Sequence, residues 1–170
     1  LCDLPEGAPV LVEKKAQGFF TLGYVPSCEE IWLVATGTGL APFVSMLRTD
    51  EPWQGFSRIV VVHGVREALH LAYRDELAQR SKEHGGRLTW VPVVSREPEA
   101  RDVLHGRITT ALESGELERF AGVSLSPDRS HLMLCGNPEM IRELSERLEL
   151  RGLRKHRVRR PGHVSTEHYW

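Results

Sequence analysis

The amino-acid sequence predicts an α/β fold, a doubly wound parallel sheet, over most of its 170 residues. Four apolar runs are nearly continuous, which is typical of strands that are covered on both faces. Between these runs lie segments with apolar residues at helical spacing. Strands that alternate with helices in this way form parallel sheets with helices on both sides. We therefore expect the carboxyl ends of the strands to meet at one edge of the sheet.

The apolar runs set the expected positions of the elements. Strands are expected at Ile31–Ala35, Ile59–His63, Leu88–Val94 and Leu132–Cys135, with a last strand across Lys155–Arg159. Helices are expected at Ala41–Leu47, Tyr73–Glu83, Ile108–Leu112 and Leu117–Phe120.

One further helix has clear boundary signals. Asn137 is a favourable N-cap and Pro138 suits the first helical turn. Gly152 suits the end of the same helix. Its apolar face should carry Met140, Ile141, Leu144 and Leu148.

The residues before Glu30 follow a different pattern. Val10–Glu13 and Gly18–Leu22 suggest two short strands around a polar turn at Lys15–Gln17. No helix separates them, so we expect them to be antiparallel. Two strands alone are not stable, and we expect them to belong to a larger sheet.

The composition excludes several classes of function. The length suits one domain, or one domain plus a fragment. The net charge of −1 gives no reason to expect binding to nucleic acid, and no apolar run approaches the about 20 residues that span a membrane. The three cysteines are widely spaced, which favours a reducing, cytoplasmic setting and indicates no metal site.

Glycines and polar residues follow the expected strands, at the edge where open α/β sheets bind ligands. The segments that directly follow the strands, called strand exits below, are Thr36–Gly39, His63–Arg66, Ser95–Glu97 and Cys135–Pro138. Each of them could be a plain hydrophilic turn. Because they should converge on one crevice, together they predict a binding site.

The first exit and three arginines favour a phosphate-containing ligand. The glycines of Thr36–Gly39 let a backbone approach a ligand closely, and the helix start at Leu40–Pro42 suits a pyrophosphate. Arg66, Arg96 and Arg107 carry guanidinium groups that match phosphate oxygens. The alternatives are a tight turn that needs glycine and three solvated arginines.

Three other features each allow more than one interpretation. Cys135 ends an apolar strand and could be an inert buried residue. The final pair, Tyr169-Trp170, could be a frayed tail or an aromatic docking element. The run Arg154–Arg160 holds five Lys/Arg residues, and could be a solvated edge strand, a docking surface for an acidic protein or, least favoured, a nucleic-acid patch.

Five motifs together resemble the bacterial ferredoxin/flavodoxin–NADP⁺ reductase family. They are Ala35–Pro42, Val94–Glu97, Gly106–Ile108, Leu134–Met140 and Pro161–Trp170. Their order, their spacing and the Tyr-Trp ending all match the family. The likeness runs from about Gly7 to the C-terminus.

The resemblance implies two parts. Residues 1–27 would be the C-terminal remnant of an antiparallel FAD-binding β-barrel, and residues 28–170 an NADP-binding domain with a flavin-facing tail. The family's flavin motif, Arg-x-Tyr-Ser, and its FAD pyrophosphate site are absent from this sequence. The full-length protein is expected to bind FAD, and the chain alone to be inactive without its FAD domain.

The resemblance also implies roles for single residues. Those holding the dinucleotide near its pyrophosphate and nicotinamide would be Thr36, Gly37, Thr38, Gly39 and Pro42. Those binding the 2′-phosphate of NADP(H) would be Arg66, Arg96 and Arg107, with Ser95, Gly136 and Asn137 completing the cofactor site. Cys135 and Glu167, the expected catalytic residues, would line the place where nicotinamide meets flavin, and Trp170 would pack on FAD.

The implied activity is hydride transfer between NADP(H) and FAD, coupled to one-electron exchange with ferredoxin or flavodoxin. The cofactors supply this chemistry and the protein supplies placement and electrostatics. A monomer is expected. Two alternatives stay open, a reductase component of an oxygenase system and a non-enzymatic NADP-binding module.

Overall fold

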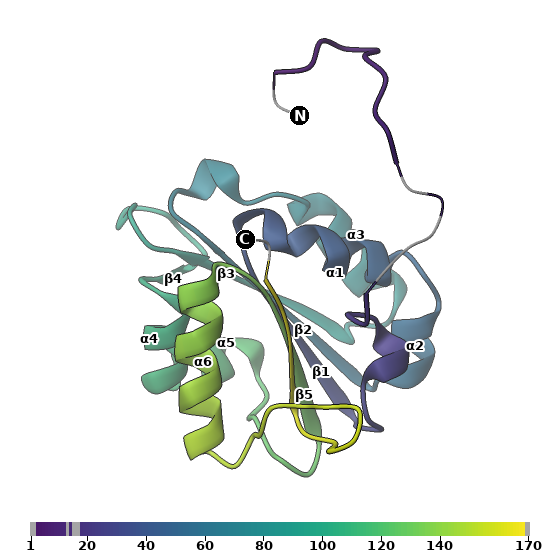
Figure 1. Cartoon of the computed structure of the whole chain (residues 1–170). Coiled ribbons are helices and arrows are strands. Elements are labelled where there is room, and N and C mark those ends of the chain that lie inside the picture. The colour runs from purple at the N-terminus through teal and green to yellow at the C-terminus, as the bar shows by residue number, and fades with distance from the viewer. Residues whose placement is uncertain (1–2, 13, 15–17, 169–170) are drawn as a thin grey trace.

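A six-stranded sheet, parallel throughout, forms the centre of the computed structural model, which describes residues 3–12, 14 and 18–168 (Figure 1). The strands are β1 Glu30–Thr36, β2 Arg58–Val65, β3 Leu88–Val94, β4 Leu104–His105, β5 Ser130–Gly136 and β6 Val164–His168. Their order across the sheet is β4-β3-β2-β1-β5-β6. The predicted doubly wound parallel sheet is confirmed.

Helices cover both faces of the sheet (Figure 1). One face carries α1 Ala41–Leu47, α2 Glu51–Gly55 and α3 Arg74–Glu83. The other carries α4 Ile108–Glu113, α5 Glu116–Ala121 and α6 Pro138–Leu150. Short 3₁₀ helices lie at Leu22–Tyr24, Gly37–Leu40 and Ala68–His70.

Strand β1 shows why its sequence is apolar at every position. Ile31 and Leu33 pack into the core beneath α1, whereas Trp32 and Val34 pack into the core beneath α6. All four side chains are buried, because successive residues of a strand point to opposite faces and both faces are covered here.

The strand order creates a switch point between β1 and β5. From β1 the chain first builds β2, β3 and β4 outward on one side. It then returns to place β5 on the other side of β1. Connections therefore leave the carboxyl ends of β1 and β5 in opposite directions, which opens a crevice at this point in doubly wound folds.

The boundaries of α6 agree with the prediction. The Asn137 side-chain oxygen accepts hydrogen bonds from the backbone N–H groups of Glu139 at 2.8 Å and Met140 at 3.2 Å. Ile141, Leu144 and Leu148 are buried on the predicted face. The helix ends shortly before Gly152, whose φ of 82° suits a residue without a side chain.

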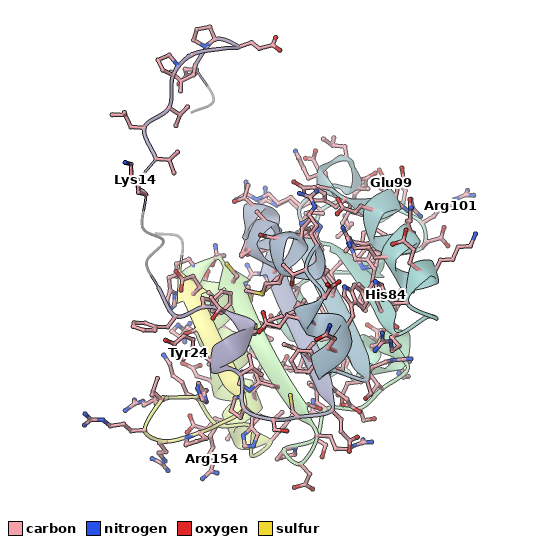
Figure 2. All side chains as sticks on the ribbon, turned by 90° about the vertical axis from the view of Figure 1, so that its right-hand side faces the viewer. Lys14, Tyr24, His84, Glu99, Arg101 and Arg154 are labelled. Carbon is pink, nitrogen blue, oxygen red and sulfur yellow. The ribbon has the colours of Figure 1, made fainter. Side chains whose placement is uncertain are left out.

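The last strand is not where the sequence predicted it. Lys155–Arg159 belongs to an exposed loop, and the strand is β6, which pairs with β5 from Leu132↔Val164 to Gly136↔His168. The basic run forms only isolated β-bridges, Lys155↔Val164 and Arg157↔Arg160. Val164, and not an arginine, supplies the buried apolar side chain next to β5. This basic loop precedes a parallel strand, so it lies at the amino end of the sheet. Figure 2 shows Arg154 at that end, opposite Glu99 and Arg101, which follow β3.

The two antiparallel strands expected before Glu30 are also absent from the described residues of those segments. Residues 3–12 run away from the sheet (Figure 1). Leu11 is fully exposed and Val12 is 83% exposed, so neither has an apolar surface on which a strand could pack. Leu22, expected to end the second strand, instead begins a 3₁₀ turn and is buried.

A buried histidine, His131, lies near the amino end of β5. The His131 ring lies in β5, with its Nε2 2.9 Å from the Ser165 hydroxyl of β6. The ring centroid of His156, in the basic loop, is 5.7 Å away. Burial, and after it the neighbouring His156, lowers the pKa of His131 to about 3.

Acid is expected to destabilise the fold through His131. The unfolded chain restores a pKa of about 6.5, so it takes up a proton that the folded chain excludes. Stability from the neutral ring is complete above that pH and is lost as the pH falls toward about 3. Between pH 7 and 5, urea denaturation should show the native chain losing about 2 kcal/mol more than His131→Gln.

His105→Gln is the matched control, because it removes an exposed ring from β4. It should keep the native pH dependence. Identical pH dependence of His131→Gln and the native chain would contradict the role given to His131.

Candidate functional site

A cleft of about 910 Å³ lies at the carboxyl ends of β1, β2 and β3, close to the switch point. It contains eight of the residues that the sequence predicted for a cofactor site. They are Thr36, Gly37, Thr38, Arg66, Ser95, Arg96, Arg107 and Asn137. The structure therefore brings together strand exits that are up to 101 residues apart in the sequence.

The ends of β1 and β5 touch beside this cleft. The backbone N–H of Asn137 donates to the Thr36 hydroxyl at 2.8 Å. Gly39 packs so closely on β5 that a Cβ atom there would lie 2.5 Å from the Cys135 carbonyl oxygen. Gly136 has a φ of 126°, and a Cβ on it would meet the Thr36 backbone. Both glycines are therefore required by the fold of the site, whether or not a ligand is bound.

The turn after β1 presents its backbone to the cleft. Gly37–Leu40 forms a 3₁₀ helix that continues directly into α1, with Gly37 at a φ of 52°. Gly37 and Thr38 are exposed and line the cleft. Pro42, in the first turn of α1, is half-buried and does not line the cleft.

His63 holds this turn in place by a hydrogen bond to its backbone. The imidazole is buried at the end of β2, and its Nε2 lies 3.1 Å from the carbonyl oxygen of Gly37. A carbonyl oxygen only accepts hydrogen bonds, so Nε2 carries the proton. Burial lowers the pKa of His63, which keeps the ring neutral. Since the C=O and N–H of a trans peptide point in opposite directions, this bond turns the Thr38 N–H away from the ring.

The three predicted arginines are available for an anion. Arg66, Arg96 and Arg107 are all exposed at the cleft. Within residues 3–12, 14 and 18–168, none of them forms an ion pair. Most arginines within the helices are paired instead, as in the Arg80–Glu76 contact of α3 at 3.2 Å. Three unpaired guanidinium groups around one cleft favour a ligand with phosphate or carboxylate oxygens.

The predicted catalytic residues lie beside the cleft and do not line it. Cys135 and Glu167 are register partners on β5 and β6, so their side chains are on the same face of the sheet. Cys135 is wholly buried, whereas Glu167 is exposed at the edge. Trp170, together with Tyr169, falls outside the described residues.

Several cleft residues were not predicted from the sequence as site residues. His70, Tyr73 and Thr109 line it, as do Met140 and Glu143 from α6. The sequence predicts Tyr73 within a helix, but with a φ of 60° it precedes α3 and lines the cleft. A positive φ at a tyrosine is uncommon, and no local sequence signal indicates it. The guanidinium of Arg48 lies 5.8 Å from the centre of this ring.

Other kinds of site receive no support from the described part of the chain. It contains no group of three or more His, Cys, Asp or Glu residues that could hold a metal ion. Its longest helix, α6, has 13 residues, and none of its helices is long and apolar enough to cross a membrane.

Comparisons with known proteins give matches over most of the chain. The family described as oxidoreductase NAD-binding domain matches residues 33–146. The flavodoxin/ferredoxin–NADP reductase of Escherichia coli (strain K12) is 43% identical over 171 residues, which cover 100% of this chain and 68% of that protein. The ferredoxin–NADP reductase of Pseudomonas aeruginosa is 32% identical over 96% of this chain and 66% of that protein.

Among solved structures, a ferredoxin NADP⁺ reductase from Neisseria gonorrhoeae with bound FAD and NADP has a similar fold. Its TM-score is 0.86 at 31% sequence identity, over 93% of this chain and 63% of that one. The chain thus spans about two thirds of the length of the relatives that it matches.

Proposed function

Because the chain belongs to the flavodoxin/ferredoxin–NADP reductases, we propose that it binds NADP(H) along the carboxyl edge of its sheet for hydride exchange with FAD. FAD, when bound in the full-length protein, supplies the step between two-electron and one-electron chemistry. Ferredoxin or flavodoxin is the proposed partner for the single electrons. These proposals concern the whole protein, of which the chain is the nucleotide-binding part.

The order of groups along the sheet edge carries the proposal. Arg107, Arg96 and Arg66 follow β4, β3 and β2 at one end, and the Thr36–Gly39 turn follows β1 in the middle. Cys135 and Glu167 lie on β5 and β6 at the other end. Neighbouring strands are about 4.8 Å apart, so about 14 Å separate β3 from β5. An extended dinucleotide could place its 2′-phosphate at the arginines and its nicotinamide near β5.

The residues at the cleft fit NADP(H) chemically. The three arginines supply unpaired donors for the 2′-phosphate, and the exposed backbone at Gly37 and Thr38 leaves room for a pyrophosphate. The side-chain oxygen of Asn137 is already engaged in capping α6. We therefore assign Asn137 the task of holding the start of α6 and, through its N–H, the end of β1.

Roles near the flavin are proposed from position and resemblance. Cys135 and Glu167 would line the meeting point of nicotinamide and flavin, with Gly136 next to Cys135 at the end of β5. Trp170 would pack on FAD. We also propose a cytoplasmic location, in keeping with three widely spaced cysteines, and a monomer.

The basic loop is a weaker candidate for partner docking than its charge suggests. Arg157 and Arg159 are exposed, but they lie at the amino end of β6. The five residues of β6 separate this loop from the cleft edge by about 16 Å. A partner on this loop would be distant from the residues proposed to face the flavin.

Nucleotide titration tests the first half of the proposal. The chain should bind NADP⁺ and 2′-AMP measurably by calorimetry, and NAD⁺ at least about tenfold more weakly, because only the first two carry the 2′-phosphate. Equal affinity for NADP⁺ and NAD⁺ would contradict it.

Reduction of the full-length protein tests the second half. NADPH should bleach its visible flavin band, and reoxidation should reduce ferredoxin or flavodoxin. Nucleotide binding without flavin reduction would instead favour a non-enzymatic module. Reduction of flavin without transfer to either carrier would favour an oxygenase reductase component.

A further inference from the structure

The loops that carry Arg66 and Arg96 are joined beyond the ends of their strands. Backbone N–H groups of Ser95 and Arg96 donate to the carbonyl oxygens of Val65 at 3.0 Å and Arg66 at 2.8 Å. The Ser95 hydroxyl also donates to the Val65 carbonyl at 3.2 Å. The strand pairing itself ends at Val65↔Val94, so these bonds link the two loops where the strands end, and both arginines line the same cleft.

Beyond Arg66 the link between the two loops is made by a side chain. The Glu97 carboxylate accepts a hydrogen bond from the backbone N–H of Ala68 at 2.6 Å. Ala68 begins the 3₁₀ helix Ala68–His70, and the first N–H groups of a helix have no partner within it. A carboxylate is a strong acceptor for such a group. The loop is therefore held at two points, the Arg66 carbonyl and the Ala68 N–H.

We propose that Glu97 is a positioning residue that sets the preference of this cleft for NADP(H) over NAD(H). It holds the Arg66 loop against the Arg96 loop, so that both guanidinium groups are presented to one phosphate. This inference rests on the proposed NADP(H) site and names a further residue that determines its specificity.

The charge of Glu97 opposes the binding of a phosphate, so its contribution comes from geometry. A negative group near an anion site weakens the site by like-charge repulsion. Here the Glu97 carboxylate oxygen accepts from the Ala68 N–H, and Arg66 and Arg96 supply the positive charge of the site. Ordering two long arginine side chains is entropically costly, and a mobile backbone beneath one of them would add to that cost.

Three substitutions of Glu97 separate the effect of side-chain length from that of its charge. Glu97→Gln keeps an oxygen that can reach Ala68 and removes the charge. Glu97→Asp keeps the charge but is one methylene too short, and Glu97→Ala removes the acceptor. Glu118→Ala is the matched control. The Glu118 carboxylate accepts a similar hydrogen bond from the Leu125 N–H at 2.7 Å, and Glu118 does not line the cleft.

The experiment measures dissociation constants for NADP⁺ and NAD⁺ by calorimetry, and amide exchange of Ala68 by NMR in the nucleotide-free chain. Glu97→Ala and Glu97→Asp should weaken NADP⁺ binding by about tenfold, leave NAD⁺ within about twofold and speed exchange at Ala68. Glu97→Gln should restore both native values. Glu118→Ala should leave both nucleotides unchanged.

Different failures have different meanings. If the native chain itself does not prefer NADP⁺, the proposed function fails and this inference with it. If the native preference is present but Glu97→Ala and Glu97→Asp retain it, Glu97 does not set it. If Glu97→Gln and Glu97→Ala both lose NAD⁺ binding, Glu97 contacts the ribose directly and the positioning role is wrong.

Discussion

Replacing Gly136 with alanine is expected to destabilise the chain by about 3 kcal/mol or more and to abolish measurable NADP⁺ binding. Two costs combine at this residue. Its φ of 126° is a conformation that alanine rarely adopts, and its Cβ would lie 2.8 Å from the Thr36 carbonyl oxygen and still closer to the Thr36 hydroxyl. Relief of that contact would separate the ends of β1 and β5, which form one wall of the site.

Two other glycines separate these costs. Gly39 has an ordinary φ but packs against the Cys135 carbonyl, so Gly39→Ala should cost about 2 kcal/mol from overpacking alone. Gly115 has a φ of 73° with nothing within 4 Å, so Gly115→Ala should cost about 1 kcal/mol from strain alone. Urea denaturation measures all three, and calorimetry measures NADP⁺ binding.

Only the two glycines at the switch point should affect the nucleotide. Gly115 is the N-cap of α5 and does not line the cleft, so its variant should bind NADP⁺ normally. If Gly136→Ala were no less stable than Gly115→Ala, the close approach of β1 and β5 would not be a constraint on the fold.

Removing one cleft arginine should weaken NADPH binding by about tenfold to a hundredfold and leave NADH binding nearly unchanged. Arg96 and Arg107 follow β3 and β4 and line the cleft without an ion-pair partner among the described residues. A hydrogen bond to a charged group contributes about 1.5–3 kcal/mol, and about 1.4 kcal/mol corresponds to a factor of ten. The measurement is titration of Arg96→Ala and Arg107→Ala with both nucleotides.

Arg101→Ala is the control for general charge. Arg101 is exposed in the loop after β3, at the same end of the sheet, but does not line the cleft (Figure 2). Its loss should change NADPH binding by less than about threefold, because exposed charges interact weakly through water. Equal losses for NADH and NADPH in Arg96→Ala would contradict the assignment of this residue to the 2′-phosphate.

The sequence alone predicted a parallel sheet with helices on both faces and the edge of the sheet where the cleft lies. Continuous apolar runs such as Ile31–Ala35 required cover on both faces, which implied a parallel sheet with helices on each side. Asn137 and Pro138 fixed the start of α6 through local hydrogen bonding that needs no distant partner. Strand exits rich in glycine and arginine then had to converge, because parallel strands end at the same edge.

Only the tertiary structure decided the features that depend on a neighbour distant in sequence. Val164–His168 became a strand, and Lys155–Arg159 did not, because β5 offers an edge to the former. His63 and Glu97 lie in segments that the sequence predicted at the site, but their contacts with Gly37 and Ala68 are visible only in the structure. Tyr73 has no local sequence signal that places it at the cleft. Helix capping and apolar periodicity depend on residues close together in the sequence, whereas strand partners and contacts between loops exist only after the sheet has formed.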